Sequence, residues 1–458
     1  FADGADIVTA SAGTSNFRAG VNAGNSIQAG GNYNVVIGDE AGTALTTGDD
    51  NVAIGFEALS TEDTGTRAVA VGYRALKVQN SDTTNYNVAV GYDAGLSVTT
   101  GTQNVIIGGK AGDALTVGDD NVAIGRAALT TDTQGSNSTA VGMNALATQN
   151  FTSATNSDNV AVGYNAGTAI TTGVQNTILG ALAGDALTTS SRNVAVGYEA
   201  LSTATAYNEN TAVGYRALRV NTDGYSNTAV GVNSLLANTT GHSNVAVGHA
   251  AGTAVTTGDE NVIIGMNAGL NLTTGNYNIL IGHNPRTSQV DSEKQIVMGR
   301  DVVGAGGDHF TFGDGSTDSA IEFGATSITA PSDQRYKEDI ATATAGLAFI
   351  KDLRPVTFKW KKEKDLPTSH RAYVEGSESR TINDYTNHGF IAQEVKAVID
   401  AHSEIKDGFD MWSTDEQADG GRQRIGDASL MPIMVKAVQE LSKKNDALEA
   451  RLAALESA

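Results

Sequence analysis

Apolar and polar positions alternate in a short phrase that recurs along the first two thirds of the chain. In Asn51–Gly55 the order is Asn-Val-Ala-Ile-Gly, so Val52 and Ile54 lie on one face of a predicted strand and Ala53 on the other. We expect the larger aliphatic side chains to fill the inside of a coil. The small alanine then permits close approach of a neighbouring surface, and the glycine allows a backbone turn that a side chain would resist.

The closing glycine of this phrase recurs at a nearly constant step from Gly38 to Gly299. The step is about 17 residues, a length that fits one coil of a β-solenoid, and such self-similarity decides the fold class. The steps that end at Gly91 and at Gly163 are longer than the others. Four positions after each closing glycine, glycine and leucine alternate in pairs, which indicates duplication of a block of four coils. The sequence therefore predicts a mainly β protein built on a β-solenoid, or β-roll.

Polar residues mark the corners of the predicted coils. Asn51 and its equivalents are expected to stack and to bond to each other along the solenoid, as amide ladders do. Acidic pairs recur at the turns: Asp49-Asp50, Asp119-Asp120 and Asp259-Glu260. Metal binding and a solvated edge are both compatible with such pairs. We favour the solvated edge and expect no metal, because the pairs do not match the calcium-binding nonapeptide repeat.

The predicted coils contain few large residues, so a solenoid of one chain would be thin. We expect three chains to pack side by side, each supplying small-residue faces to a shared axis. The NVAIGxxA coils resemble the head repeats of trimeric autotransporter adhesins over about residues 34–299, and this resemblance implies a trimeric left-handed β-roll. The chain lacks the C-terminal membrane-anchor strands of that family, which disfavours a bacterial outer-membrane adhesin.

Changes in the repeat and in composition divide the chain into four predicted segments. These are a lead-in (1–33), the β-roll fibre (34–299), a β-stem or cap (300–331) and a mixed α+β domain (332–458). Two insertions, 77–86 and 147–158, are expected to project from the fibre as tolerated surface insertions, with receptor-contacting loops as the alternative. Both tryptophans lie in the last segment, so the two parts are not expected to share a core.

The last segment has its own pattern. Residues 353–361 alternate apolar and polar positions and predict a strand, with which residues 371–374 could pair. Residues 389–399 have a helical period. From Leu430 the chain is predicted to be helical, with apolar residues at two heptad positions, which indicates a parallel coiled coil over about residues 429–456. A polar residue in that seam, Asn445, is expected to specify register and the number of partners.

Four phrases of this segment occur in order: SDQRYKEDI from Ser332, LRPVTFKWK, HGFIAQEV and LMPIMVKAVQEL. Together they resemble the intramolecular chaperone domain of endosialidases and other phage tail spikes, which is a self-cleaving serine peptidase domain also found in myelin regulatory factor. The resemblance implies a trimeric domain that templates the fibre and then releases itself. The nucleophile of that family matches Ser332, and its basic partner matches Lys337.

The chemistry of this dyad is reasonable from the residues themselves. A serine hydroxyl is a poor nucleophile until a base removes its proton, and a neutral lysine can do so. Burial, or the neighbouring Arg335, would depress the pKa of Lys337. Ser332 would attack the carbonyl carbon of Pro331, giving an ester that water hydrolyses. This is a single-turnover serine peptidase that acts on no external substrate.

Other polar residues near the dyad are expected to support it. Asp333 and Glu338 are placed to hold Arg335 and Lys337, and a histidine farther along could contribute to the site. The supporting candidates are Asp333, Arg335, His388 and Glu394.

Charge and composition limit the partners. The net charge of −21 argues against nucleic acid, and no apolar run is long enough to insert into a membrane. Without cysteine the chain has neither disulfides nor thiol catalysis, and we expect no cofactor. The sequence therefore predicts a homotrimeric phage tail fibre or virion appendage that contacts other virion proteins on its N-terminal side and a host receptor or glycan. The alternative is a bacterial surface adhesin located at the cell surface. A glycan-degrading tail spike is disfavoured, because such regular coils offer no large loop to build a carboxylate-lined cleft.

Overall fold

The chain forms two compact units, Phe1–Ser332 and Asp333–Ala458. A computed structural model describes residues 11–205, 208–315, 317–325, 334, 337–368, 372–405, 411–414, 423–426 and 429–457. The described part of the first unit is a β-solenoid in which equivalent positions of most neighbouring coils are 17 apart in the sequence. The described part of the second unit is a small mixture of helices and short strands. The protein is thus mainly β, as the sequence predicts.

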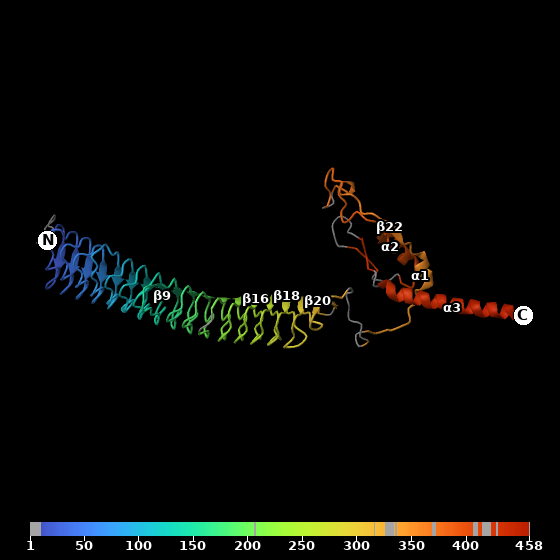
Figure 1. Ribbon diagram of the computed structural model, residues 1–458, viewed down its shortest axis with the longest axis horizontal. Helices are drawn as coiled ribbons and strands as arrows, with labels where there is room; N and C mark the ends of the chain where they lie inside the picture. The colour runs from blue at the N-terminus through green and yellow to red at the C-terminus, as the bar shows by residue number, and fades with distance from the viewer. Residues whose placement is uncertain are drawn as a thin grey trace. The chain divides into compact units, whose positions relative to one another are not determined.

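The solenoid is held by one ladder of 19 strands, of which all but the last are parallel, and its coils stack side by side from the blue to the yellow end of Figure 1. The ladder begins one coil before the boundary expected at Asn34, because β1 pairs in parallel with β2. The parallel strands are β1 (Phe17–Ala19), β2 (Val35–Ile37), β3 (Val52–Ile54), β4 (Val69–Val71), β5 (Val88–Val90), β6 (Val105–Ile107), β7 (Val122–Ile124), β9 (Thr139–Val141), β11 (Val160–Val162), β12 (Thr177–Leu179), β13 (Val194–Val196), β14 (Thr211–Val213), β15 (Thr228–Val230), β16 (Val245–Val247), β17 (Val262–Ile264), β18 (Ile279–Ile281), β19 (Ile296–Arg300) and β20 (His309–Asp314).

The two faces of each strand are the reverse of the expectation. Ala53 is fully buried inside its coil, whereas Val52 and Ile54 are half-buried on the outer face. In this coil the narrow interior is already occupied by Ala58 and Leu59, so only a small residue fits at the centre of β3. The expectation that the larger aliphatic side chains fill the coil was therefore wrong. These side chains instead give the ladder an apolar outer surface.

The alternation of glycine and leucine reflects how the interior is filled. A Cβ at Gly95 would lie 3.0 Å from Cδ1 of Ile106, so glycine makes room for a large residue at the centre of the next strand. Leu59 stands in its coil at the position that Gly95 has in another coil. In the coil of Leu59 the residue at the centre of the strand is the small Ala53. Leu59 adopts a φ of 51°, a left-handed conformation that costs a non-glycine residue free energy. Coils with leucine therefore always combine it with alanine, at the cost of this strain.

Most coils with leucine also carry a polar side chain three positions later, where coils with glycine carry an aliphatic one; the coil of Leu201 carries Ala204 instead. In each pair of such coils the two polar side chains bond to each other inside the solenoid. The pairs are Gln79 Nε2 to Glu62 Oε2 at 3.0 Å, Gln149 Nε2 to Asp132 Oδ2 at 2.6 Å and Asn238 Nδ2 to Asn221 Oδ1 at 2.7 Å. Burial raises the pKa of Glu62 above its ordinary value, although hydrogen bonds from Gln79, Gly65 and Ser81 oppose this rise. Each of these buried polar side chains thus has its partner in a neighbouring leucine coil.

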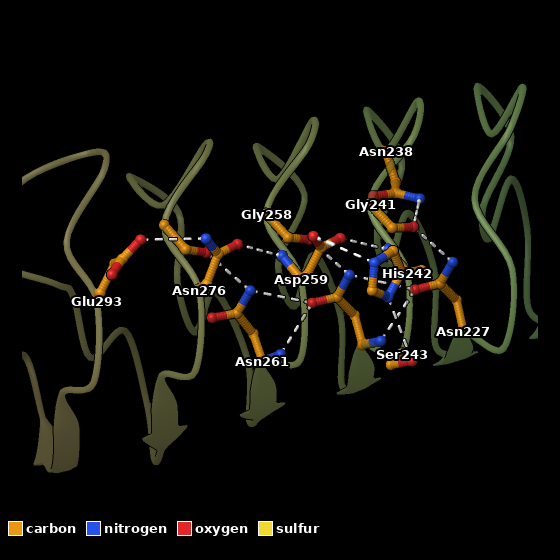
Figure 2. Close-up of polar contacts among 12 residues, drawn as sticks. Asn227, Asn238, Gly241, His242, Ser243, Gly258, Asp259, Asn261, Asn276 and Glu293 are labelled. Carbon is orange, nitrogen blue, oxygen red and sulfur yellow. Dashed lines mark hydrogen bonds and ion pairs between the residues drawn. The ribbon is translucent and has the colours of Figure 1, made fainter.

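A buried asparagine row runs along the solenoid and confirms the expected amide ladder. The Oδ1 of Asn51 accepts the backbone N–H of Ala68 at 2.9 Å, and its Nδ2 donates to the carbonyl of Gly65 at 2.9 Å. In many coils the Nδ2 also donates to the preceding asparagine, as Asn261 does along the row seen in Figure 2. Each amide therefore satisfies backbone groups at a corner that water does not reach.

Both insertions form parallel pairings of their own, outside the ladder of 19 strands. In the longer one, β10 (Thr155–Asn156) pairs in parallel with β8 (Gly135–Ser136), while the shorter one forms a parallel bridge between Thr66 and Thr84. A buried carboxylate of the solenoid anchors each insertion. The N–H of Ser81, in the shorter insertion, donates to Glu62 at 3.2 Å, and the N–H of Phe151, in the longer one, donates to Asp132 at 3.1 Å.

At the other end, β20 and β21 (Thr317–Glu322) form an antiparallel hairpin that closes the ladder. Both strands lie in residues 300–331, for which the sequence predicts a β-stem or cap. The last strand of the described solenoid thus runs against the others, and the parallel stacking of coils ends there.

The second unit packs three helices against short strands. Its elements are α1 (Leu347–Asp352), β22 (Val356–Phe358), a 3-10 turn (Glu363–Asp365), β23 (Asn387–Gly389), α2 (Ala392–Ala401), β24 (Trp412–Thr414), β25 (Gln423–Ile425) and α3 (Leu430–Glu456). The predicted strand at 353–361 pairs with β23 and not with residues 371–374, of which Arg371 lies outside the described residues. The core of the second unit contains Phe349, Val395, Ile399, Leu430 and Ile433.

The long helix α3 joins this core only through its first turns. Leu430, Ile433 and Ala437 are buried, and the carboxylate of Glu440 accepts the N–H of Leu347 at 2.9 Å, which caps α1. Pro432 lies in the first turn, where its missing N–H has no intrahelical partner to lose. The predicted helix from Leu430 is confirmed.

Candidate functional site

The predicted cleavage site lies at the boundary between the two units. Pro331, Ser332, Asp333 and Arg335 are outside the described residues. Lys337 is described, is exposed, and donates its backbone N–H to the carbonyl of Gln334 at 3.1 Å. The structure thus describes one member of the predicted dyad, at the start of the second unit.

His388 lies on β23, opposite Thr357 of β22, and its side chain is exposed. It lines a surface groove of about 370 Å³ whose other walls are mostly apolar. The lining residues are Phe358, His388, Gly389, Phe390, Ile425, Leu430, Met431 and Met434. A histidine in such a groove is accessible from solvent, so it can exchange a proton with a group that enters the groove.

Glu394, in the first turn of α2, is committed to an ion pair. Its carboxylate accepts two hydrogen bonds from the guanidinium of Arg354, one of them from Nε at 2.9 Å. These bonds lower the pKa of Glu394. A carboxylate held ionised in this way is a poor proton acceptor, and it joins the start of α2 to the chain before β22.

A further histidine, which the sequence reasoning missed, links helices of the second unit. His402 lies directly after α2, and its ring nitrogens are each 2.9 Å from a carboxylate, Glu404 on one side and Asp352 of α1 on the other. The ring packs edge-on against Phe349 with centroids 5.3 Å apart. Hydrogen bonds to Glu404, and then to Asp352, raise the pKa of His402. No motif in the sequence connects these residues, because Asp352 is 50 positions away from His402.

The apolar heptad positions of α3 are uncovered in the single chain. They are between 45% and 73% exposed, and the set comprises Met431, Met434, Val438, Leu441, Leu448, Leu452 and Leu455. Met431 and Met434 also line the groove beside His388. Asn445, on the same helix, donates to Glu449 at 2.8 Å. An exposed seam of this length is a surface for other helices.

The outer face of the solenoid is similarly apolar. Residues of its strands on that face are between 36% and 40% exposed: Ile107, Val162, Leu179, Val230, Val247, Ile264 and Met298. They recur at the same place in successive coils, so they form a continuous column along the ladder. Such a surface is larger than scattered exposed apolar residues would give.

The acidic residues at the turns have a structural role. Asp259 accepts the backbone N–H of His242 at 2.8 Å and donates its own N–H to Asn276 at 2.7 Å, in the outer row of Figure 2. Asp49 and Asp119 accept backbone N–H groups of the preceding coil in the same way. Among the described residues there is no cluster of three or more metal-ligating side chains. The turn carboxylates therefore bond backbone groups of neighbouring coils.

Comparison with known proteins assigns the second part. Residues 332–404 match the family model described as chaperone of endosialidase, and this confirms the resemblance inferred from the phrases beginning at Ser332. Comparisons with curated proteins and with solved structures gave no match. Within the described part of the chain, none of the helices has the length and apolarity needed to cross a bilayer.

Proposed function

We propose, from the match of residues 332–404 to the endosialidase chaperone family, that this chain is a trimeric phage tail fibre or similar virion appendage. Its C-terminal domain templates the folding of three solenoids and then cuts itself off between Pro331 and Ser332. The observation that carries this proposal is the position of the match, which begins at Ser332, directly at the boundary between the two compact units. A cut at that place falls one residue before the division between the units, so it releases the second unit whole, with Ser332 attached to it.

The proposed cleavage is an acyl transfer within the chain. Lys337, in its neutral form, takes the proton of the Ser332 hydroxyl, whose oxygen attacks the carbonyl carbon of Pro331. The peptide bond breaks, the amine of Ser332 leaves with a proton, and an ester joins the two parts. Water then hydrolyses the ester. One cut ends the reaction, because the released carboxylate is no longer a substrate.

Two apolar surfaces support a trimer. The outer column of the solenoid and the seam of α3 are both exposed in a single chain, and each runs along its own element, so three copies can cover each surface. This assigns the valine and isoleucine face, and not the alanine face, to the shared axis. Host attachment is the proposed role of the solenoid surface that remains outside.

A separate chaperone solves a problem of register. The coils are so similar that two solenoids displaced by one coil would make nearly the same contacts. A trimeric C-terminal domain fixes the alignment of the three chains and raises their local concentration. After its removal, chains that unfold can no longer regain this alignment, so the fibre persists kinetically.

The test of cleavage is the size of the chain on a denaturing gel. The wild type is expected to give two pieces, one that ends at Pro331 and one that runs from Ser332 to Ala458. Ser332→Ala and Lys337→Ala are each expected to leave one full-length band. Ser403→Ala and Lys359→Ala, which change the same residue types in the same unit, serve as matched controls and should cut normally. Full-length wild type, or cutting in Ser332→Ala, would refute the proposal.

A bacterial surface adhesin with the same chaperone is the second candidate. It is favoured by the likeness of the NVAIG coils to adhesin head repeats. Neighbouring genes distinguish the two, since virion genes indicate a fibre and secretion genes an adhesin.

A further inference from the structure

We propose that the solenoid carries two slots beside exposed tyrosine rings, and that each slot binds one sugar ring of a neutral polysaccharide. This rests on the proposed attachment role and names the ligand class for it. The slots lie at Gly109 and at Ala181, where a small residue interrupts a column of side chains.

The column is formed by the residue that follows each closing glycine. Phe56, Tyr73 and Tyr92 stack on one another in three successive coils, with ring centroids 5.4 and 5.2 Å apart. Tyr198 and Tyr215 form a second stack at 5.7 Å. These five rings are between 41% and 54% exposed. The column therefore presents flat aromatic surfaces to solvent wherever a stack ends.

The first slot follows the most exposed ring of the first stack. Lys110 N–H donates to the carbonyl of Tyr92 at 2.8 Å, and Ala127 N–H donates to that of Gly109 at 3.1 Å, so Gly109 occupies the next position of the column. A Cβ built on Gly109 would meet nothing within 4 Å. Tyr73 stacks on one face of the Tyr92 ring, and Tyr92 is 54% exposed.

The second slot repeats the first one four coils later. Leu182 N–H donates to the carbonyl of Tyr164 at 2.9 Å, and Glu199 N–H donates to that of Ala181 at 3.2 Å, so Ala181 lies between two tyrosines of the column. The ring of Tyr198 is backed by Tyr215. The recurrence of a small residue after tyrosine, at the same place in two blocks of coils, is a second observation that points to a ligand.

The spacing of the slots fits one ring. Two coil steps of about 4.8 Å place the backbone positions of Tyr164 and Tyr198, on either side of Ala181, about 10 Å apart. A flat ring inserted midway would lie about 5 Å from each, close to the 5.2 Å between Tyr73 and Tyr92. The ligand would thus take the place of the missing side chain and continue the stack.

The charges around the slots favour a neutral ligand. Arg126 follows Gly109 in the column, whereas Tyr198 follows Ala181, so a tyrosine face is what the slots share. The net charge of −21 opposes nucleic acid bases as the stacked ring. A pyranose offers an apolar C–H face to the ring and hydroxyl groups to water. The two slots are four coils, or about 19 Å, apart, so one polysaccharide can occupy both and gain affinity.

The test is to fill each slot with a tyrosine side chain of the protein itself. In the full-length Ser332→Ala chain, Gly109→Tyr and Ala181→Tyr together place a tyrosine at each of the two half-buried positions. Migration is measured in native gels that contain dextran, galactomannan or glycogen. We expect at least one of these neutral polysaccharides to retard the parent chain, and the filled variant to lose at least tenfold in affinity. Tyr92→Ala with Tyr164→Ala should lose binding as well.

Matched controls separate the slots from exposed tyrosines in general. Tyr33→Ala with Tyr277→Ala removes two exposed rings from a different column and should leave retardation unchanged. Sedimentation must show the same oligomer for every variant. The inference is overturned if none of the three polysaccharides retards the parent chain, or if the filled variant binds as the parent does. Cleavage of the wild-type chain on a denaturing gel is an independent readout, so failure of either proposal is recognised separately.

Discussion

At the scale of single residues, the interior of the solenoid is a choice between two ways of filling the same space. Gly167 admits Ile178, whose Cδ1 would lie 3.0 Å from a Cβ at that glycine. Leu146, in the preceding coil, fills the corresponding space beside Ala140. The alternation of glycine and leucine was visible in the sequence, but its cause was not, because it depends on side chains from different coils.

Coupling between these two positions is testable. Gly167→Leu is expected to destabilise the solenoid by about 1–3 kcal/mol through overpacking, and Ile178→Ala by about 2–5 kcal/mol through a cavity. The double variant should lose less than the sum, since the inserted leucine occupies part of the cavity. Denaturant unfolding measures all three. Gly109→Leu, which meets open space, is the control and should change stability by less than about 0.5 kcal/mol. Additive losses would contradict this packing account.

At the scale of elements, the sequence predicted the coils and the helix α3 because each depends on local period and turn residues. It did not predict which face of the strands is buried. The alternation of Val52, Ala53 and Ile54 defines two faces of the strand. It does not indicate how wide the coil is, and the width decides which face can be buried. The sequence reasoning also missed the partner of β22. This partner, β23, lies beyond the 3-10 turn, and nothing in the local sequence indicates that the two strands pair. His402 was missed for the same reason.

The contacts of His402 predict a pH dependence for the second unit. Its pKa is raised in the folded state, so its ion pairs stabilise the unit fully below the ordinary value of 6.5. This contribution is lost as the pH rises through the folded pKa. The melting temperature of the second unit in the full-length Ser332→Ala chain should therefore fall between about pH 6 and 8. His402→Ala should abolish that fall, whereas His388→Ala should retain it. An identical slope in His402→Ala would exclude this role for the histidine.

At the scale of the whole molecule, the two units differ in how they specify structure. The second has an irregular core with one arrangement of α1, α2 and α3, whereas the first repeats one coil with small variations. Ser332 and its neighbours, where the units meet, lie outside the described residues, so the proposed site depends on the family match and on Lys337. The repeated coils of the first unit do not specify how three chains align with one another. We propose that the irregular second unit sets this alignment.

Refolding tests this proposed role of the second unit. Cleaved wild-type fibre and uncleaved Ser332→Ala chain are denatured under the same conditions and then diluted into buffer. We expect the uncleaved chain to recover trimers in good yield, because its chaperone is still attached, and the cleaved fibre to recover at least tenfold fewer. Sedimentation measures the yield. Equal recovery would show that the solenoids align without help, and the proposed reason for cleavage would fail.

The ladder has a mechanical consequence. Its backbone hydrogen bonds join each coil to the next, so a pull along the solenoid acts on those bonds directly and in series. The end coil would detach first, and each detachment would release a tether of about 17 residues, or roughly 55 Å when extended. In the proposed tail fibre, a load between particle and cell would then lengthen the solenoid by stages, and each stage would absorb work before the attachment fails.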